Sequence, residues 1–323
     1  MADGVGVRVG AAILGHEGDG GLRVRSVLDH GVHTPYSDPG PHATLFADVS
    51  TDPADVSAVA RNVIVHYRAS GHELPLDTRD EINARWLEDI LAADQRRHPW
   101  PLAAPRDVTD RVQGCCRDHS LFCVGVLRSH GIPARTRVGF AGYFVDGWHH
   151  DHVIVEAWLD DRWVRFDSEV DTPRPSLSTP MDIGPSPLDH TGFVTAAQAW
   201  VAYRHGTIDA DTYGVGPEVP GFRGPFFLFD EVIFEVAHRF GDELLLWDGW
   251  GRVGEPDRTI SEPDAEWLDE IADLLIAADS GDLDAERTLL QRYRTDDGLH
   301  PGPSVMQASP YGDEPIEIAL HRK

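Results

Sequence analysis

The stretch Gln113–Val124, QGCCRDHSLFCV, contains all three cysteines of this 323-residue chain. Its apolar residues continue downstream, and their spacing predicts a strongly hydrophobic helix over Cys115–His130. Gly131 stands where a C-terminal cap is expected, and Pro133 prevents the helix from continuing. The two adjacent cysteines are therefore expected at the helix N-terminus. There, unpaired backbone N–H groups and the positive end of the helix dipole favour a thiolate and lower a thiol pKa.

A thiol cluster of this kind has three possible roles: a metal site, a buried apolar helix face, or a catalytic nucleophile. Cys116 and His119 share a helix face, and residues 149–152, HHDH, supply further imidazoles. However, adjacent cysteines on a helix do not easily bind one ion, and the chain has no Cys-x-x-Cys spacing. We therefore expect no metal and no cofactor. Cys123, two turns further on, fits a small buried hydrophobe, which leaves Cys116 as the candidate nucleophile.

Residues 151–167, DHVIVEAWLDDRWVRFD, predict a β-hairpin. Residues 152–159 and 162–167 are strand-like, and the two aspartates between them form a two-residue turn. This register pairs aromatic with aromatic and acid with base. The predicted pairs are Leu159 with Arg162, Trp158 with Trp163, Glu156 with Arg165, and Ile154 with Asp167.

In this register His152 and Asp167 are diagonal neighbours on one face of the hairpin. A carboxylate on one ring nitrogen of a histidine fixes the tautomer and leaves the other nitrogen to act on a thiol. Cys116, His152 and Asp167 thus supply a nucleophile, a base and an orienting group. Each also has an ordinary interpretation, since the chain has 17 histidines and an aspartate commonly ends a strand.

Three stretches, GCCRDHSLFCVGVLRSHGIPARTRVGF, HVIVEAW and WVRFD, together resemble the transglutaminase-like cysteine enzyme superfamily. Its members typically show a Gly-x-Cys helix start, a Gly-Ile-Pro-Ala-Arg turn, a His strand with a Glu four residues later, and a Trp-x-x-Phe-Asp strand. The resemblance covers roughly residues 107–171. It implies a papain-like core with Cys116 as nucleophile, His152 as base and Asp167 as orienting group. Two features depart from the pattern. Cys115 makes the nucleophile ambiguous by one residue, and His119 stands where a bulky hydrophobe or aromatic is usual.

The resemblance implies an α+β fold in which the nucleophile lies at the N-terminus of a helix packed on an antiparallel sheet. We expect one large domain over residues 1–323, with mixed α/β N- and C-terminal extensions. Its parts are N-terminal strands and helices (1–106), the transglutaminase-like core (107–171), and a long loop with a mostly helical extension (172–323). Apolar spacing predicts further helices over residues 51–71, 80–96, 264–278 and 282–293, and the tail after Gly298 is expected to be loosely held.

The formal net charge of −26 argues against nucleic acid or an anionic membrane as partner. Its simplest meaning is a solvated acidic surface. No apolar run approaches the roughly 18–20 residues of a membrane helix, and the first residues do not resemble a secretory signal. An odd number of cysteines, two of them adjacent, does not make a disulfide framework. Reduced thiols in the cytoplasm are therefore expected; the oligomeric state is not predicted.

The function predicted from these features is acyl transfer through an acyl-enzyme on Cys116. The expected substrate is an amide, a peptide or an acyl thioester, and either water or an amine acceptor resolves the intermediate. The backbone N–H of Cys116 would contribute to an oxyanion site, with Gln113 as a weak candidate for the second donor. Two alternatives stay open: a non-catalytic binding or scaffolding protein of the same fold, and a less favoured metal-dependent hydrolase.

Overall fold

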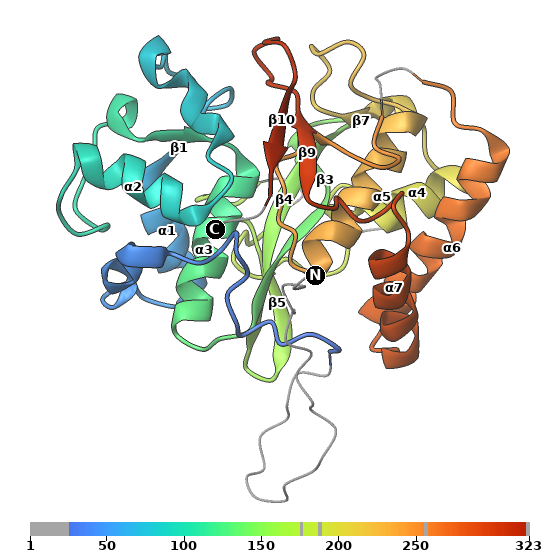
Figure 1. Cartoon of the computed structure of the whole chain (residues 1–323), viewed down its shortest axis with the longest axis horizontal. Coiled ribbons are helices and arrows are strands. Elements are labelled where there is room, and N and C mark those ends of the chain that lie inside the picture. The colour runs from blue at the N-terminus through green and yellow to red at the C-terminus, as the bar shows by residue number, and fades with distance from the viewer. Residues whose placement is uncertain (1–25, 175–176, 187–188, 255–257, 321–323) are drawn as a thin grey trace, which may run out of the picture.

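The computed structural model describes residues 26–174, 177–186, 189–254 and 258–320 (Figure 1). The α-helices are α1 (Pro53–Val63), α2 (Leu87–Arg97), α3 (Cys116–Ser129), α4 (Ala196–Arg204), α5 (Pro225–Arg239), α6 (Glu262–Asp279) and α7 (Leu283–Thr295). The strands are β1 (Ile64–His66), β2 (Val112–Gly114), β3 (Ala134–Val145), β4 (Trp148–Leu159), β5 (Arg162–Phe166), β6 (Phe193–Thr195), β7 (Tyr213–Gly214), β8 (Asp248–Gly249), β9 (Ser304–Gln307) and β10 (Ile316–Ala319). Short 3-10 helices cover Gly40–Phe46, Leu76–Asn83, Val108–Asp110 and Ala210–Thr212.

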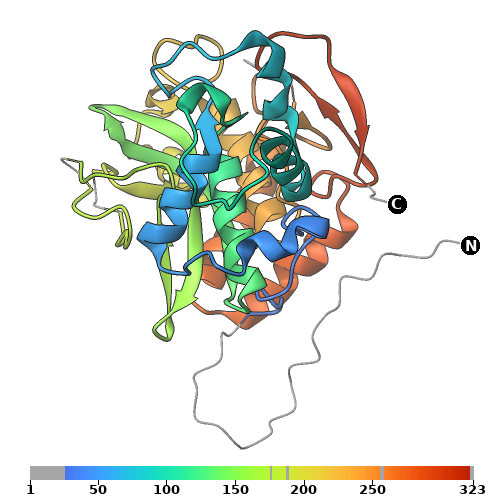
Figure 2. The ribbon, with the colours of Figure 1, turned by 90° about the vertical axis from the view of Figure 1, so that its left-hand side faces the viewer.

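The long strands form a sheet of order β5-β4-β3-β6, antiparallel throughout, with β7 joining β4 in parallel. Helix α3 packs against β4 and β3, and α5 also packs against β3. Figures 1 and 2 show α1–α3 on one side of the long strands and α5–α7 on the other. The expected α+β fold, with the cysteine helix packed on an antiparallel sheet, is confirmed.

Helix α3 agrees with the prediction to within one residue at each end. Gly131, at φ 73°, has the left-handed conformation of a C-terminal cap. At the other end, the Asp118 carboxylate accepts a hydrogen bond from the Cys115 backbone N–H at 2.8 Å. Residues 116–128 of α3 are all buried, so the helix runs through the core. Cys116 is thus held on a rigid, fully packed element.

The hairpin has the predicted turn and register. Asp160 and Asp161 both have positive φ, at 50° and 59°, as a two-residue type I′ turn requires. Pairing runs from Leu159 with Arg162 to Val155 with Phe166, and it includes the two tryptophans and the acid–base pair. The predicted pair of Ile154 with Asp167 lies one step beyond the ladder and does not form. The Asp167 N–H instead donates to the Pro180 carbonyl at 2.8 Å.

Three predictions outside the core need correction. The helix expected over residues 51–71 ends at Val63, because the next residues form β1 and pair in parallel with β2. The helix expected over residues 80–96 is a 3-10 helix followed by an extended break, and α2 begins only at Leu87. The tail expected to be loose after Gly298 carries β9 and β10, which form a sheet with β8. In the first and third cases, pairing with a distant segment overrides the local pattern.

The larger hydrophobic core draws on side chains from the N-terminal, central and C-terminal segments, among them Val56, Phe122 and Ile271. The subdivision at residues 106/107 and 171/172 stays a prediction. Part of the N-terminal segment, whose sequence predicts strands and helices over residues 1–106, lies outside the described residues, since the structure describes it from residue 26. Within the described ranges, no helix combines the length and apolarity needed to cross a bilayer.

Candidate active site

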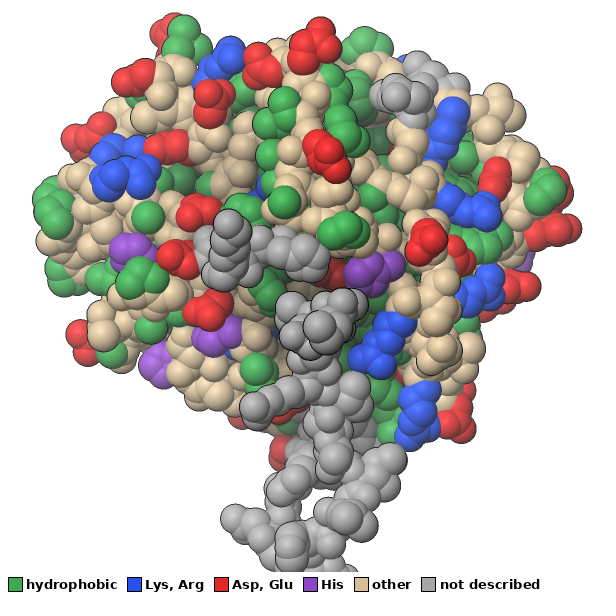
Figure 3. Space-filling view, in the orientation of Figure 1, with side chains coloured by type: hydrophobic (Ala, Val, Ile, Leu, Met, Phe, Trp, Pro, Cys, Tyr) green, Lys and Arg blue, Asp and Glu red, His purple; other side chains and the backbone are tan. Residues whose placement is uncertain are grey.

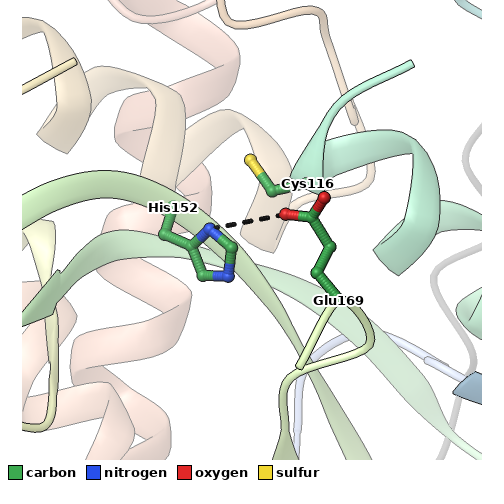
Figure 4. Close-up of side chains that lie close together, drawn as sticks. All are labelled: Cys116, His152 and Glu169. Carbon is green, nitrogen blue, oxygen red and sulfur yellow. Dashed lines mark ion pairs between the residues drawn. The ribbon is translucent and has the colours of Figure 1, made fainter. Parts of the chain in front are cut away.

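The three predicted site residues come from three elements that meet at one point. Cys116 is the first residue of α3, His152 lies on β4, and Asp167 follows the end of β5. All three side chains are buried, with relative exposures of 5%, 3% and 0%. Figure 4 shows Cys116 and His152 side by side, with a third side chain, Glu169, close to both.

His152 and Asp167 form the predicted hydrogen bond. His152 Nε2 lies 2.8 Å from Asp167 Oδ2, which also accepts a bond from the Tyr143 hydroxyl at 2.6 Å. The other oxygen of Asp167 accepts from the Glu169 backbone N–H at 2.9 Å. These bonds hold the carboxylate in place and direct the second ring nitrogen of His152, Nδ1, away from it. The positioning that the hairpin register predicted is therefore present.

These contacts also set the charges of the pair. Burial alone would raise the pKa of Asp167, but His152, Tyr143 and the Glu169 N–H together lower it below its ordinary value. Burial alone would lower the pKa of His152, but Asp167, with help from Glu169 and Asp151, raises it above 6.5. Asp167 is thus an ionised carboxylate that stabilises an imidazolium.

The Cys116 thiol lies within reach of this histidine. Cys116 Sγ, a ring nitrogen of His152 and a carboxylate oxygen of Glu169 all lie within 4.8 Å of one another. A small side-chain rotation would bring sulfur and nitrogen together, and catalytic hydrogen bonds commonly tighten in this way only when substrate binds.

The electrostatics of the thiol differ from the prediction. A hydrogen bond with the Cys115 thiol, burial, and the nearby carboxylates of Glu169 and Asp151 raise the pKa of Cys116 well above its ordinary value. The predicted lowering at the helix N-terminus is therefore wrong, because local desolvation and negative charge outweigh the helix end. Burial also raises the pKa of Cys123, to about 12, and this thiol is fully buried as predicted.

Glu169, which sequence reasoning did not single out, completes the site and lies between His152 and His119. The Glu169 carboxylate is 15% exposed and lies 3.9 Å from His152 Nδ1 and 3.4 Å from His119 Nδ1. The His119 ring also contacts the Cys115 carbonyl at 2.9 Å. The Asp-x-Glu spacing at residues 167–169 was the available signal for Glu169. It was missed because the chain leaves the strand at that point, where strand alternation no longer predicts direction.

Gln113 does not supply an oxyanion donor in this structure. Its side-chain amide donates to the Pro75 carbonyl at 2.7 Å and to the Thr78 hydroxyl at 2.9 Å. That amide is therefore occupied in holding the start of the 3-10 helix Leu76–Asn83 beside β2. Tyr67 lies nearer the helix start, since its backbone N–H donates to the Gly114 carbonyl at 2.9 Å.

The imidazoles of residues 149–150 do not join the cysteine. His149 stacks on Tyr213 with ring centroids 4.1 Å apart, and His150 lies against Phe144 and Trp148. Among the described residues, the ligand-type side chains that converge are Cys116, His152 and Glu169. Of the metal ligands considered from the sequence, Cys116 and His152 converge, and Glu169 joins them where His119 and the imidazoles of residues 149–150 had been considered.

Comparison with known proteins gives a family-model match and a similar solved structure. Residues 68–168 match the family model of the transglutaminase-like superfamily. The match begins well before residue 107, where the resemblance was expected to start, and it includes Cys116, His152 and Asp167. A solved structure from Cytophaga hutchinsonii, described as a candidate cysteine protease, is similar at 16% identity and a TM-score of 0.31. That similarity covers 51% of this chain and 45% of the other. No curated protein matches the sequence.

Proposed function

We propose that this protein is a cysteine-dependent acyl-transfer enzyme in which Cys116 is the nucleophile, His152 the general base and Asp167 the orienting group. The observation that carries the proposal is the 2.8 Å hydrogen bond from His152 to Asp167 beside a helix-start cysteine. A binding or scaffolding protein would have no use for a thiol, an imidazole and a buried carboxylate in this order.

The raised pKa of the Cys116 thiol determines how the nucleophile forms. The resting site holds a neutral thiol rather than a preformed thiolate. As sulfur approaches the substrate carbonyl, His152 Nδ1 takes the thiol proton, and Asp167 stabilises the resulting imidazolium. The S–C bond forms while the carbonyl electron pair moves onto oxygen.

The negative oxygen needs donors on the α3 side of the site. The Cys116 backbone N–H lies in the first turn of the helix, where such groups have no partner within the helix. Tyr67 is our candidate for the second donor, because its backbone is bonded to Gly114 and its ring lies beside the Cys115–Cys116 pair.

Collapse of the tetrahedral intermediate expels the amine or thiol leaving group, which takes the proton from His152. The acyl group stays on Cys116 as a thioester. Water or an amine then attacks this thioester, and His152 removes the proton of the attacking group. The enzyme is thus a hydrolase with water and a transferase with an amine.

The superfamily match supports a peptide or amide substrate, and acyl thioesters fit the same chemistry. The carboxylates of Glu169 and Asp151 near the thiol would attract a cationic group, such as the protonated form of an amine acceptor. The face of the molecule drawn in Figure 3 has acidic side chains spread over much of it, with basic side chains among them. This distribution fits a solvated surface. A cytoplasmic location, and the absence of nucleic-acid and membrane partners, stay predictions.

The proposal is tested by trapping the acyl-enzyme. Wild-type protein and Cys116→Ala are mixed with a small activated acyl ester, quenched in acid, digested and measured by mass spectrometry. We expect one acyl group on the peptide that contains Cys116 in the wild type, and its release as hydroxamate by hydroxylamine. Acylation of Cys115 would move the nucleophile by one residue. Absence of any acyl adduct over a panel of esters, thioesters and amides would favour the scaffolding function. Hydrolysis that a chelator abolishes would favour the metal-dependent alternative.

A further inference from the structure

The three converging side chains at the site offer three different ligand atoms: a sulfur, an imidazole nitrogen and a carboxylate oxygen. These atoms lie within 4.8 Å of one another. Zn²⁺ binds such atoms at about 2.0–2.3 Å, so ligand atoms around one tetrahedral ion lie roughly 3.3–3.8 Å apart. The site therefore needs an inward movement of about 1 Å or less for each side chain, which rotamer adjustment supplies.

The surroundings prepare His152 to bind a metal. Asp167 accepts the hydrogen bond of Nε2 at 2.8 Å, which leaves Nδ1 as the nitrogen available to an ion. A carboxylate that orients a histidine in this way is the usual outer partner of a histidine ligand to zinc. Asp167 is itself held by Tyr143 and by the Glu169 N–H, so the orientation does not have to be acquired on binding.

Glu169 has the position of a third ligand. Its two oxygens lie 3.4 Å from His119 Nδ1 and 3.9 Å from His152 Nδ1, and its side chain keeps 15% exposure. An ion entering from solvent thus meets this carboxylate beside the thiol and the imidazole. The Asx-type bond from its own N–H to Asp167 fixes the backbone of Glu169 next to the orienting residue.

We propose that Cys116, His152 and Glu169 form a Zn²⁺ site that inhibits the enzyme reversibly. The ion replaces the thiol proton on Cys116 and takes Nδ1 of His152, so one ion occupies both the nucleophile and its base. The proton leaves to solvent, and water fills the fourth position. The mixed S, N, O set favours Zn²⁺ over Mg²⁺ and Ca²⁺, which prefer oxygen ligands. The inhibitory consequence rests on the proposed function, whereas the metal site itself does not.

The site is tested on full-length protein that has been stripped with a chelator. Binding of Zn²⁺ is measured by titration calorimetry, and Co²⁺ is used as a spectroscopic substitute that gives a thiolate charge-transfer band. The accessibility of Cys116 is followed by its rate of alkylation with iodoacetamide, quantified by mass spectrometry. None of these measurements needs a substrate. The variants are Glu169→Gln and, as a matched control on an exposed surface, Glu73→Gln.

We expect one Zn²⁺ per chain, a slowing of Cys116 alkylation by at least tenfold, and full recovery after chelation. Mg²⁺ should have no effect. Glu169→Gln should weaken Zn²⁺ binding by at least tenfold, while Glu73→Gln should bind as the wild type does. Equal Zn²⁺ affinity in the two variants, or alkylation of Cys116 at an unchanged rate in saturating Zn²⁺, would overturn the site.

Two further outcomes separate this proposal from the proposed function. If Zn²⁺ protects Cys116 but no acyl-enzyme is ever found, the metal site stands and the acyl-transfer function fails. If an acyl-enzyme forms and Zn²⁺ leaves its rate unchanged, the acyl-transfer function stands and inhibition is refuted. Stimulation of hydrolysis by Zn²⁺ would refute inhibition and the thiol mechanism together.

Discussion

Strand β4 carries two buried polar clusters four residues apart, and they differ in how their charges are matched. At His152, a thiol, an imidazole and two carboxylates meet. At Glu156, the carboxylate lies between Arg135 at 2.7 Å and Arg165 at 2.6 Å. Burial opposes the charge of Glu156, but the arginines on both sides hold its pKa well below its ordinary value.

The Glu156 cluster extends into the C-terminal helices. Arg137 on β3 lies 3.0 Å from Glu235 on α5 and also contacts Asp279 at the end of α6. Arg239 forms ion pairs with Asp279 at 2.7 Å and with Glu286 of α7 at 3.0 Å. This cluster therefore ties α5, α6 and α7 to the sheet by opposite charges.

Burial of charged groups, which both clusters share, does not by itself mark a functional site. In the Glu156 cluster the acids and bases face one another and hold each other in place. In the His152 cluster a ring nitrogen and a thiol lie within 4.8 Å of each other, beside the carboxylate of Glu169. The first arrangement lowers the energy of the fold, while the second leaves groups available for chemistry. Variants at the His152 cluster should therefore change activity, and variants at the Glu156 cluster should change the free energy of unfolding.

The largest effect is expected at the nucleophile. Cys116→Ala should lower kcat/KM of acyl transfer by about 10³–10⁶-fold, since removal of a nucleophile leaves only binding and oxyanion stabilisation. The free energy of unfolding should hardly change. Steady-state kinetics and urea denaturation measure the two quantities. Cys115→Ala is the matched control. It should keep activity within about tenfold, because it removes only the contact between the Cys115 and Cys116 thiols. The opposite ranking would place the nucleophile at residue 115.

The orienting carboxylate should come next. Asp167→Asn should preserve the hydrogen-bond geometry but favour the wrong tautomer of His152, which lowers kcat by about 10⁴-fold. Tyr143→Phe removes only one of the bonds to Asp167 and is expected to cost about tenfold, consistent with the net value of one hydrogen bond to a charged group. An Asp167→Asn enzyme with normal kcat would remove Asp167 from the mechanism.

The Glu156 cluster should respond in stability rather than in chemistry. Arg137→Met leaves buried carboxylates without their cation and should lower the free energy of unfolding by about 3–5 kcal/mol. The kcat/KM of the folded fraction should change little. Arg162→Met is the matched control, because its ion pair with Asp182 is exposed and such pairs contribute about 0–1 kcal/mol. Loss of activity in folded Arg137→Met would break the division between the two clusters.

The smallest effect is expected in the pH dependence of Cys116 alkylation, which Glu169 influences. Because the pKa of Cys116 is raised well above its ordinary value, alkylation of Cys116 should keep accelerating through pH 9 with no plateau at lower pH. Glu169→Gln removes a negative charge near the thiol, lowers its pKa, and should speed alkylation at pH 7.5 by about threefold to tenfold. A plateau near pH 6 in the wild type would contradict the neutral resting thiol.

The protonation of His152 sets the decrease of activity at low pH. His152 must be neutral to take the thiol proton, and its pKa is raised above 6.5. The value of kcat/KM should therefore fall as the pH drops through a pKa above 6.5, and it should be fully recovered on the alkaline side. Measurement of kcat/KM between pH 5 and 9 tests the sign of this shift.

The sequence by itself determined the helix of Cys116, the two-residue turn and the hairpin register. These features are local: apolar periodicity, Gly131 as cap, and the Asp160–Asp161 turn each act within a few residues. The register then carried His152 and Asp167 to within hydrogen-bond distance, because side chains alternate along paired strands. The superfamily resemblance rested on the same stretches.

Only the tertiary structure decided the surroundings of the thiol. Glu169 and Tyr143 reach the site after the chain leaves β5 and where β3 passes β4, and no sequence spacing connects them to Cys116. The Cys115 thiol, burial, and the carboxylates of Glu169 and Asp151 raise the pKa of Cys116, against the lowering that the helix end had predicted. The C-terminal strands β9 and β10 were missed for a related reason, since pairing depends on which distant segment supplies the partner. Contacts between segments far apart in the chain therefore decided the electrostatics, while local patterns decided the positions.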